Sequence, residues 1–211
     1  DARTVNDVKV SADGKISIIS REGASNRRNG IVILDTTNPY DVKTLSEYTT
    51  NLTGGVHNLF RYEDHVYALS NGERFYVINI EDPTNPYEVG MFEIGEKGQA
   101  IHDVWIEDGL AYSSNWKHGV YMIDVGNGVA GGSPSNPVAI ANYSYESGAH
   151  HATFPFKSKS TDKFYTVLGD EIFPQGIDVY TTNETAGFIH FVDFTDINNP
   201  EEVARYELPG H

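Results

Sequence analysis

The sequence contains no cysteine among its 211 residues. Disulfide bridges, thiolate nucleophiles, Cys-ligated zinc, iron–sulfur clusters and covalently attached haem are therefore excluded. The chain also lacks an apolar run approaching the roughly 20 residues that a membrane-spanning helix requires, so no membrane insertion is expected in this segment. Its first residues, Asp1-Ala2-Arg3-Thr4, show no signal-peptide pattern.

Positive charge is also scarce, because 15 basic residues face 30 acidic ones and the formal net charge is −15. Nucleic acids and anionic membranes attract proteins through a positive surface, so neither is an expected partner. No segment shows convincing helical periodicity. The sequence also contains no G-x-S-x-G nucleophile motif, and we name no catalytic residue from it.

What the sequence does contain is a repeat. An apolar run ending in an acid or amide recurs four times, at 31–35, 75–79, 120–124 and 189–193, reading IVILD, FYVIN, VYMID and IHFVD. Each run is followed by an Asn-Pro pair, at 38–39, 85–86, 136–137 and 199–200. Four copies of a compound motif indicate a repeat architecture.

The segments between the repeated runs read as short strands bounded by turn residues. Asp13-Gly14 and Asp108-Gly109 stand where tight hairpins need positive φ. We label the strands of each unit a to d, the apolar run being strand c. Strand a is expected at 5–10, 56–62, 101–107 and 150–156, strand b at 15–21, 65–70, 110–115 and 164–169, and strand d at 43–48, 90–95, 140–145 and 203–208.

Repeated four-stranded units of this length are typical of β-propeller blades. A β-sandwich also has many short strands, but it gives no reason for one motif to return four times in the same place. We therefore predict a single all-β domain of four blades, at about 1–50, 51–97, 98–147 and 148–208. Residues 209–211 resemble the start of a next blade, although a ring of four blades is also possible.

The strand-c runs resemble those of the LVIVD repeat family, which takes its name from this run. The resemblance covers nearly the whole chain, and it is specific to the repeat and not to any reaction. It implies a β-propeller of the kind found in secreted or cell-surface proteins of bacteria and archaea, and it leads us to expect that the four blades are part of a larger ring. An extracellular, cell-surface or periplasmic location is the corresponding expectation.

Histidines recur at the start of strand a. His57, His102 and His150 hold this place, and His211 follows the fourth unit in the same way, whereas the first unit has Asn6 and Asp7. The innermost strands of a propeller line its central channel, so these imidazoles should converge at one channel mouth. They are candidate ligands, together with His151, for a transition metal such as copper or zinc, with calcium as a further option.

Neighbouring polar residues are candidates for orienting the ligands or lining the mouth: Asn58, Asp103, His118, Asp170 and Glu171, with Asn6 and Asp7. The long connection at 170–186 is a candidate cover for the mouth. The alternative is that the histidines are structural and bond to neighbouring blades. His150 and His151 also cannot both point the same way in a strand. His65 and His190 are more simply read as structural or exposed.

Two functions remain open at this stage. One is a non-catalytic, extracytoplasmic binding or assembly module, with a protein or an extracellular polymer as its partner. The other is a metal-dependent enzyme, because the strand-a histidines are similar to those of the copper-holding propellers of selenium-binding-protein-like methanethiol oxidases. Propeller lyases that use His, Tyr and a divalent cation are a further enzyme class.

Overall fold

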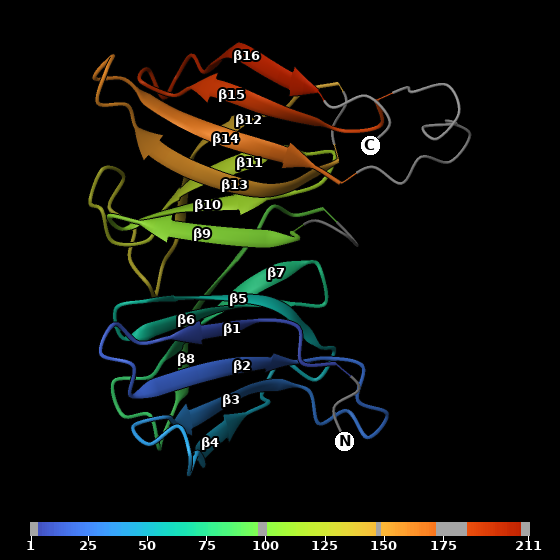
Figure 1. The fold of residues 1–211 in the computed structure, drawn as a ribbon, viewed down its shortest axis with the longest axis vertical. Coiled ribbons are helices and arrows are strands. Elements are labelled where there is room, and N and C mark those ends of the chain that lie inside the picture. The colour runs from blue at the N-terminus through green and yellow to red at the C-terminus, as the bar shows by residue number, and fades with distance from the viewer. Residues whose placement is uncertain (1–3, 97–100, 147–148, 172–184, 208–211) are drawn as a thin grey trace.

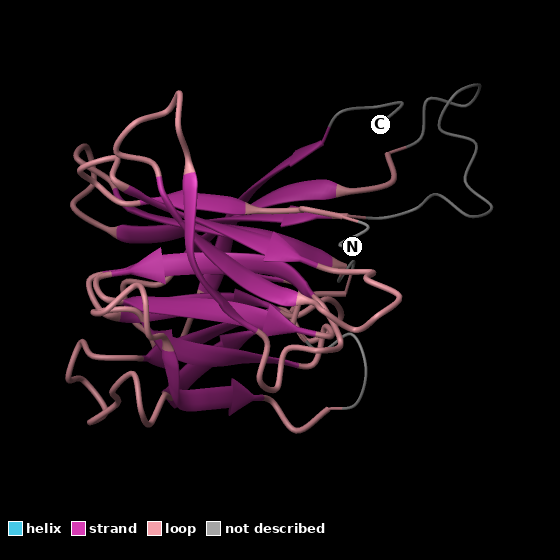
Figure 2. Ribbon diagram, turned by 90° about the horizontal axis from the view of Figure 1, so that it is seen from below, coloured by secondary structure: helices cyan, strands magenta, loops and turns pink. Residues whose placement is uncertain are grey.

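The computed structural model describes residues 4–96, 101–146, 149–171 and 185–207. In this part of the chain every regular element is a β-strand, and the strands form antiparallel four-stranded sheets (Figures 1 and 2). The first sheet contains β1 (Val8–Val10), β2 (Ile16–Arg21), β3 (Gly30–Asp35) and β4 (Lys43–Tyr48), and the second β5 (Val56–Tyr62), β6 (His65–Ser70), β7 (Arg74–Asn79) and β8 (Tyr87–Glu93). The third contains β9 (Asp103–Glu107), β10 (Leu110–Ser114), β11 (Val120–Asp124) and β12 (Val138–Tyr143), and the fourth β13 (His150–Lys157), β14 (Phe164–Asp170), β15 (Phe188–Asp193) and β16 (Glu201–Glu207).

The fold class predicted from the repeat is confirmed. Within each sheet the strands follow chain order, which is the meander of a propeller blade. The main differences lie at strand ends: β1 begins at Val8 and β8 begins at Tyr87. Tyr87 can join the sheet early because it pairs with Asn79 across a β-bulge between Val77 and Ile78.

The residues that mark the repeat have a structural role. Asp108 and Gly109 have φ values of 51° and 73° and close the β9–β10 hairpin, as the Asp-Gly pair predicts. The acid or amide that ends each strand c accepts a bond from the backbone N–H two residues later, which turns the chain toward strand d. The four bonds run from Thr37 N to Asp35, Glu81 N to Asn79, Gly126 N to Asp124 and Thr195 N to Asp193.

Hydrophobic cores lie where neighbouring blades pack together. One core joins blades 1 and 2 through residues such as Ile18 and Val66. A second joins blades 2 and 3 around Phe75 and Ile123. A third, between blades 3 and 4, includes Leu168. Apolar burial between blades is thus the main stabilising contribution, as in other repeat folds.

The innermost strands β1, β5, β9 and β13 follow one another along the stack of blades, so their N-terminal ends come together. Blades 1 and 4 lie at opposite ends of that stack (Figure 1). Both carry large apolar side chains that stay about half exposed, including Val8 at 53% and Tyr206 at 54%. None of the described residues forms a helix long and apolar enough to cross a bilayer.

Candidate metal centre

His102, His151 and Glu171 bring one potential ligand atom each to within 4.8 Å of one another. His102 immediately precedes β9, His151 is the second residue of β13, and Glu171 immediately follows β14. The His151 Nε2 atom is 3.2 Å and the His102 Nε2 atom 3.9 Å from Glu171 Oε2. Two blades therefore supply two imidazoles and a carboxylate, which is a donor set that suits a divalent transition metal.

His102 is chemically suited to bind a metal. Its Nδ1 atom is buried and has no hydrogen-bond partner among the described residues. Burial, together with the nearby rings of His151 and His57, lowers the pKa of His102 to about 4. The ring is therefore neutral near pH 7, which is the form that coordinates metals.

A β-bulge decides which of the paired histidines joins this cluster. The pairing of β13 with β14 shifts between His150 and Ala152, so that His150 faces Asp170 and His151 has no direct partner. Bulges redirect side chains in this way beside functional sites. As strand alternation requires, the two side chains diverge, and His151 is the one that reaches Glu171.

His150 lies in a buried hydrogen-bond network instead. Tyr145 donates its hydroxyl proton to Asp170 Oδ1 at 2.7 Å. The His150 Nδ1 atom is 3.2 Å from the Tyr145 hydroxyl oxygen, and its Nε2 atom is 2.7 Å from the Thr153 hydroxyl. Since the tyrosine proton goes to Asp170, Nδ1 donates to Tyr145 and Nε2 accepts from Thr153. Both nitrogens are thus engaged, and burial lowers the pKa of His150 to about 3.

Asp170 connects that network to His190. The His190 Nε2 atom is 3.2 Å from Asp170 Oδ2, and its Nδ1 atom is 2.8 Å from Glu202 Oε2. The side chains of Asp170 and His190 are fully buried. Burial, followed by the contact with Asp170, holds the pKa of Tyr145 well above its usual range. The candidate ligands His151 and Glu171 therefore directly follow His150 and Asp170, two residues fixed by this buried network.

His57 lies beside the cluster but outside the three-residue group. Its ring centroid is 5.0 Å from that of His102. Its Nδ1 atom is 3.0 Å from Glu22 Oε1, which holds the ring in place. Asn6 donates to the His57 carbonyl oxygen at 3.0 Å, and Asn58 donates to the His102 carbonyl oxygen at 3.3 Å. Both amides brace the backbone of the strand starts, and the Asn6 amide nitrogen also lies 3.4 Å from the His57 Nε2 atom.

The remaining predicted residues have other partners. Asp7 accepts bonds from Lys9 Nζ at 2.7 Å and from Leu59 N at 3.0 Å. Asp103 accepts a bond from Val104 N, and burial raises its pKa. The carbonyl oxygen of His118 accepts a bond from Asn142. His211 and residues 172–184 of the long connection lie outside the described residues.

The sequence reasoning missed Glu22 as the partner of His57 and Tyr145 as the partner of Asp170. Glu22 was visible only as one of several loop charges, and Tyr145 as the end of an outer strand. Blade geometry places the loop that carries Trp116 on the histidine face, but it does not predict the contact, in which the Trp116 ring lies 4.5 Å from that of His102. The Glu22–His57 and Tyr145–Asp170 contacts join different blades, and no local pattern indicates them.

No protein-family model and no curated protein sequence matches the chain. Among solved structures it is similar to a "putative 6-phosphogluconolactonase" from Bacteroides fragilis, with 11% identity, a TM-score of 0.65, and coverage of 94% of this chain and 55% of that one. A hypothetical selenium-binding protein from Sulfolobus tokodaii has 13% identity, a TM-score of 0.60, and coverage of 98% and 55%. The computationally designed Ika8 protein has 9% identity, a TM-score of 0.59, and coverage of 96% and 48%. The chain thus spans about half the length of these structures, and the likeness establishes a propeller-type fold alone.

Proposed function

We propose that the protein binds a divalent transition-metal ion through His102, His151 and Glu171. The observation that carries this proposal is the convergence of their three ligand atoms within 4.8 Å. Structural zinc sites are closed by four protein ligands, whereas three protein ligands leave a position for water or a small molecule. The donor set therefore suits a metal ion that also binds water or a small molecule, and it suits a purely structural ion less well.

Zinc and copper fit this donor set best. Imidazole nitrogen is a preferred ligand of both ions, and one carboxylate completes a three-ligand set. Calcium takes six to eight oxygen ligands, and the cluster supplies a single carboxylate.

A binding or assembly role remains the second candidate. The half-exposed apolar side chains on the terminal blades, such as Val8 and Tyr206, favour contact with a further protein surface. The resemblance to LVIVD repeats adds the proposal of a location outside the cytoplasm, with a protein or an extracellular polymer as partner. A redox-active or ligand-exchanging ion would favour the enzyme, and an inert or absent ion would favour the binding module.

Metal content tests the proposal directly. Protein purified without added metal is analysed for bound elements, and zinc and copper(II) are then titrated by calorimetry. We expect one ion per chain, lost in His102→Ala and in His151→Ala and weakened in Glu171→Gln. His65→Ala is the matched control, because it removes a histidine at the β5–β6 turn, where His65 contacts Asn79. Stoichiometric binding that survives both cluster substitutions would refute the site.

A further inference from the structure

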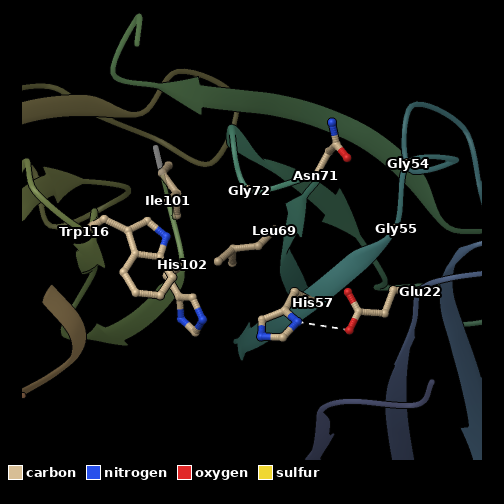
Figure 3. Close-up of a pocket in the computed structure, with 10 residues that line it drawn as sticks. All are labelled: Glu22, Gly54, Gly55, His57, Leu69, Asn71, Gly72, Ile101, His102 and Trp116. Carbon is tan, nitrogen blue, oxygen red and sulfur yellow. Dashed lines mark hydrogen bonds and ion pairs between the residues drawn. The ribbon is translucent and has the colours of Figure 1, made fainter. Parts of the chain in front are cut away.

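A cavity of about 270 Å³ opens beside His57 and His102 (Figure 3). Leu69 and Ile101, each 1% exposed, contribute apolar surface to it. The indole of Trp116 lies on one side of the view, and Gly54 and Gly55 lie on the other. Small-molecule sites usually measure roughly 300–1,000 Å³, so this cavity suits a molecule with a single ring.

Trp116 forms one wall of this cavity, and its backbone conformation is strained. Its φ is +47°, a conformation that bulky residues rarely adopt. The position is held by two bonds with His150, one from Trp116 N to His150 O at 3.0 Å and one from His150 N to Trp116 O at 3.1 Å. Gly or Asn would relieve the strain. A large aromatic side chain kept at such a position, beside a cavity, indicates a function for the indole.

His57 supplies a hydrogen-bond acceptor at the same cavity. Its Nδ1 atom donates to Glu22 Oε1 at 3.0 Å, so in the neutral ring the lone pair lies on Nε2. The Asn6 amide nitrogen is 3.4 Å from Nε2 but only 3.0 Å from the His57 carbonyl oxygen, which is its better acceptor. Nε2 can therefore accept a bond from a hydroxyl group of a ligand.

The charge of the lining limits the class of ligand. Among the described residues that line the cavity, none is Lys or Arg, and the one carboxylate, Glu22, is paired with His57. A phosphorylated ligand would find no counter-charge in the lining. A sugar would leave most of its hydroxyls unpaired, because the uncommitted polar side chains are few and the floor is apolar.

We propose that this cavity binds a single-ring phenol. The ring lies against the Trp116 indole and over Leu69 and Ile101, and the hydroxyl donates to His57 Nε2. A second, adjacent hydroxyl, as in catechol, reaches the ion held beside His102. Only this last contact rests on the proposed metal site.

The chain contains two tryptophans, Trp105 and Trp116, and the test uses the fluorescence of Trp116. In a Trp105→Phe background, fluorescence reports on Trp116 alone, and calorimetry confirms the affinities. Phenol and catechol are titrated into metal-free and zinc-loaded protein. Cyclohexanol tests the need for an aromatic ring, and phenyl phosphate tests the exclusion of an anion.

We expect phenol to bind both forms of the protein, and catechol to bind the zinc-loaded form at least tenfold more tightly than the metal-free form. The asparagine of Trp116→Asn tolerates the positive φ. This variant should bind phenol about tenfold more weakly, since an aromatic pair contributes up to about a factor of ten in affinity. Glu22→Ala should weaken phenol binding without altering zinc affinity, because it removes the acceptor that holds the His57 ring.

Three results would overturn the inference: no binding of phenol to metal-free protein at millimolar concentration, equal binding of cyclohexanol or phenyl phosphate, or unchanged affinity in Trp116→Asn. Equal catechol affinity with and without bound zinc would overturn the contact with the ion. Phenol binding without zinc binding would refute the metal site alone. Zinc binding without phenol binding would refute the phenol site alone.

Discussion

Asp170 is the residue whose replacement should reveal most about the site. Its buried carboxylate accepts the Tyr145 hydroxyl proton at 2.7 Å and faces His190 Nε2 at 3.2 Å. In Asp170→Asn the amide nitrogen would meet either the Phe188 backbone N–H, which donates to Oδ2 at 3.3 Å, or the Tyr145 O–H, so that two donors oppose each other. A buried donor left without its acceptor costs about 1–3 kcal/mol. For a chain of this size each kcal/mol lowers Tm by about 2–4 °C, so Tm should fall by roughly 2–12 °C.

Thermal unfolding followed by circular dichroism measures this loss. Asp41→Asn is the matched control, because the Asp41 side chain is 64% exposed and its carboxylate pairs with the similarly exposed Lys43 at 3.3 Å. That exposed pair should contribute less than about 1 kcal/mol. A double-mutant cycle with His190→Gln should show a coupling of about 1–3 kcal/mol between Asp170 and His190. Equal Tm values for Asp170→Asn and Asp41→Asn, or additive losses in the cycle, would refute the reasoning.

The same substitution should also weaken the candidate metal centre, because Glu171 directly follows Asp170 in the chain. Loss of such a supporting contact typically lowers metal affinity by about 10–100-fold. The comparison variant is Asp124→Asn, which perturbs a buried carboxylate at the end of β11 in blade 3. If calorimetry in the folded range finds the same zinc affinity in both variants, the network does not position Glu171.

Three further outcomes follow from single contacts. Asp124 accepts hydrogen bonds from four backbone N–H groups, at Gly126, Gly128, Ala130 and Gly132. Asp124→Asn loses two of these bonds, so urea unfolding should show a free energy of unfolding that is lower by about 1–3 kcal/mol. These bonds outweigh burial and hold the pKa of Asp124 well below its ordinary value of 3.8, so the gap between wild type and variant should be full above pH 4 and shrink as the pH falls further. Gly119→Ala should lower the free energy of unfolding by at least about 2 kcal/mol, because φ is +75° and a Cβ would collide with the Tyr143 carbonyl oxygen, whereas Gly14→Ala, at a similar φ with open space around it, should cost less. Zinc at 100 times its Kd should stabilise the protein by about 2.7 kcal/mol, and scanning calorimetry should find no such gain in His102→Ala.

Local chemistry made most of the fold predictable. The apolar runs at 31–35, 75–79, 120–124 and 189–193 are strands in the structure, and the acid or amide that ends each run starts a turn. Such features depend on residues within a few positions of one another, so a single sequence displays them. The strand starts were placed less well, because bulges such as the one at Val77 and Ile78 depend on pairing with another strand.

The candidate site was only partly predictable. Blade periodicity correctly indicated that the starts of the inner strands converge, and the structure brings His57, His102 and His151 together. Periodicity alone could not separate His150 from His151, since the choice depends on the bulge opposite Asp170. It also could not reveal that Glu171 would complete the cluster or that Tyr145 would hold Asp170.

The sequence by itself therefore determined the repeat, the order of the strands and the place of the histidines along each blade. These properties follow from apolar periodicity and turn residues, which act over short distances in the chain. Only the tertiary structure decided which side chains share the channel mouth and which are buried behind it. The reason is physical: the contacts of His102 with Glu171 and of Tyr145 with Asp170 join different blades, and a one-residue bulge in β13 directs His150 inward to Tyr145 and His151 outward to Glu171.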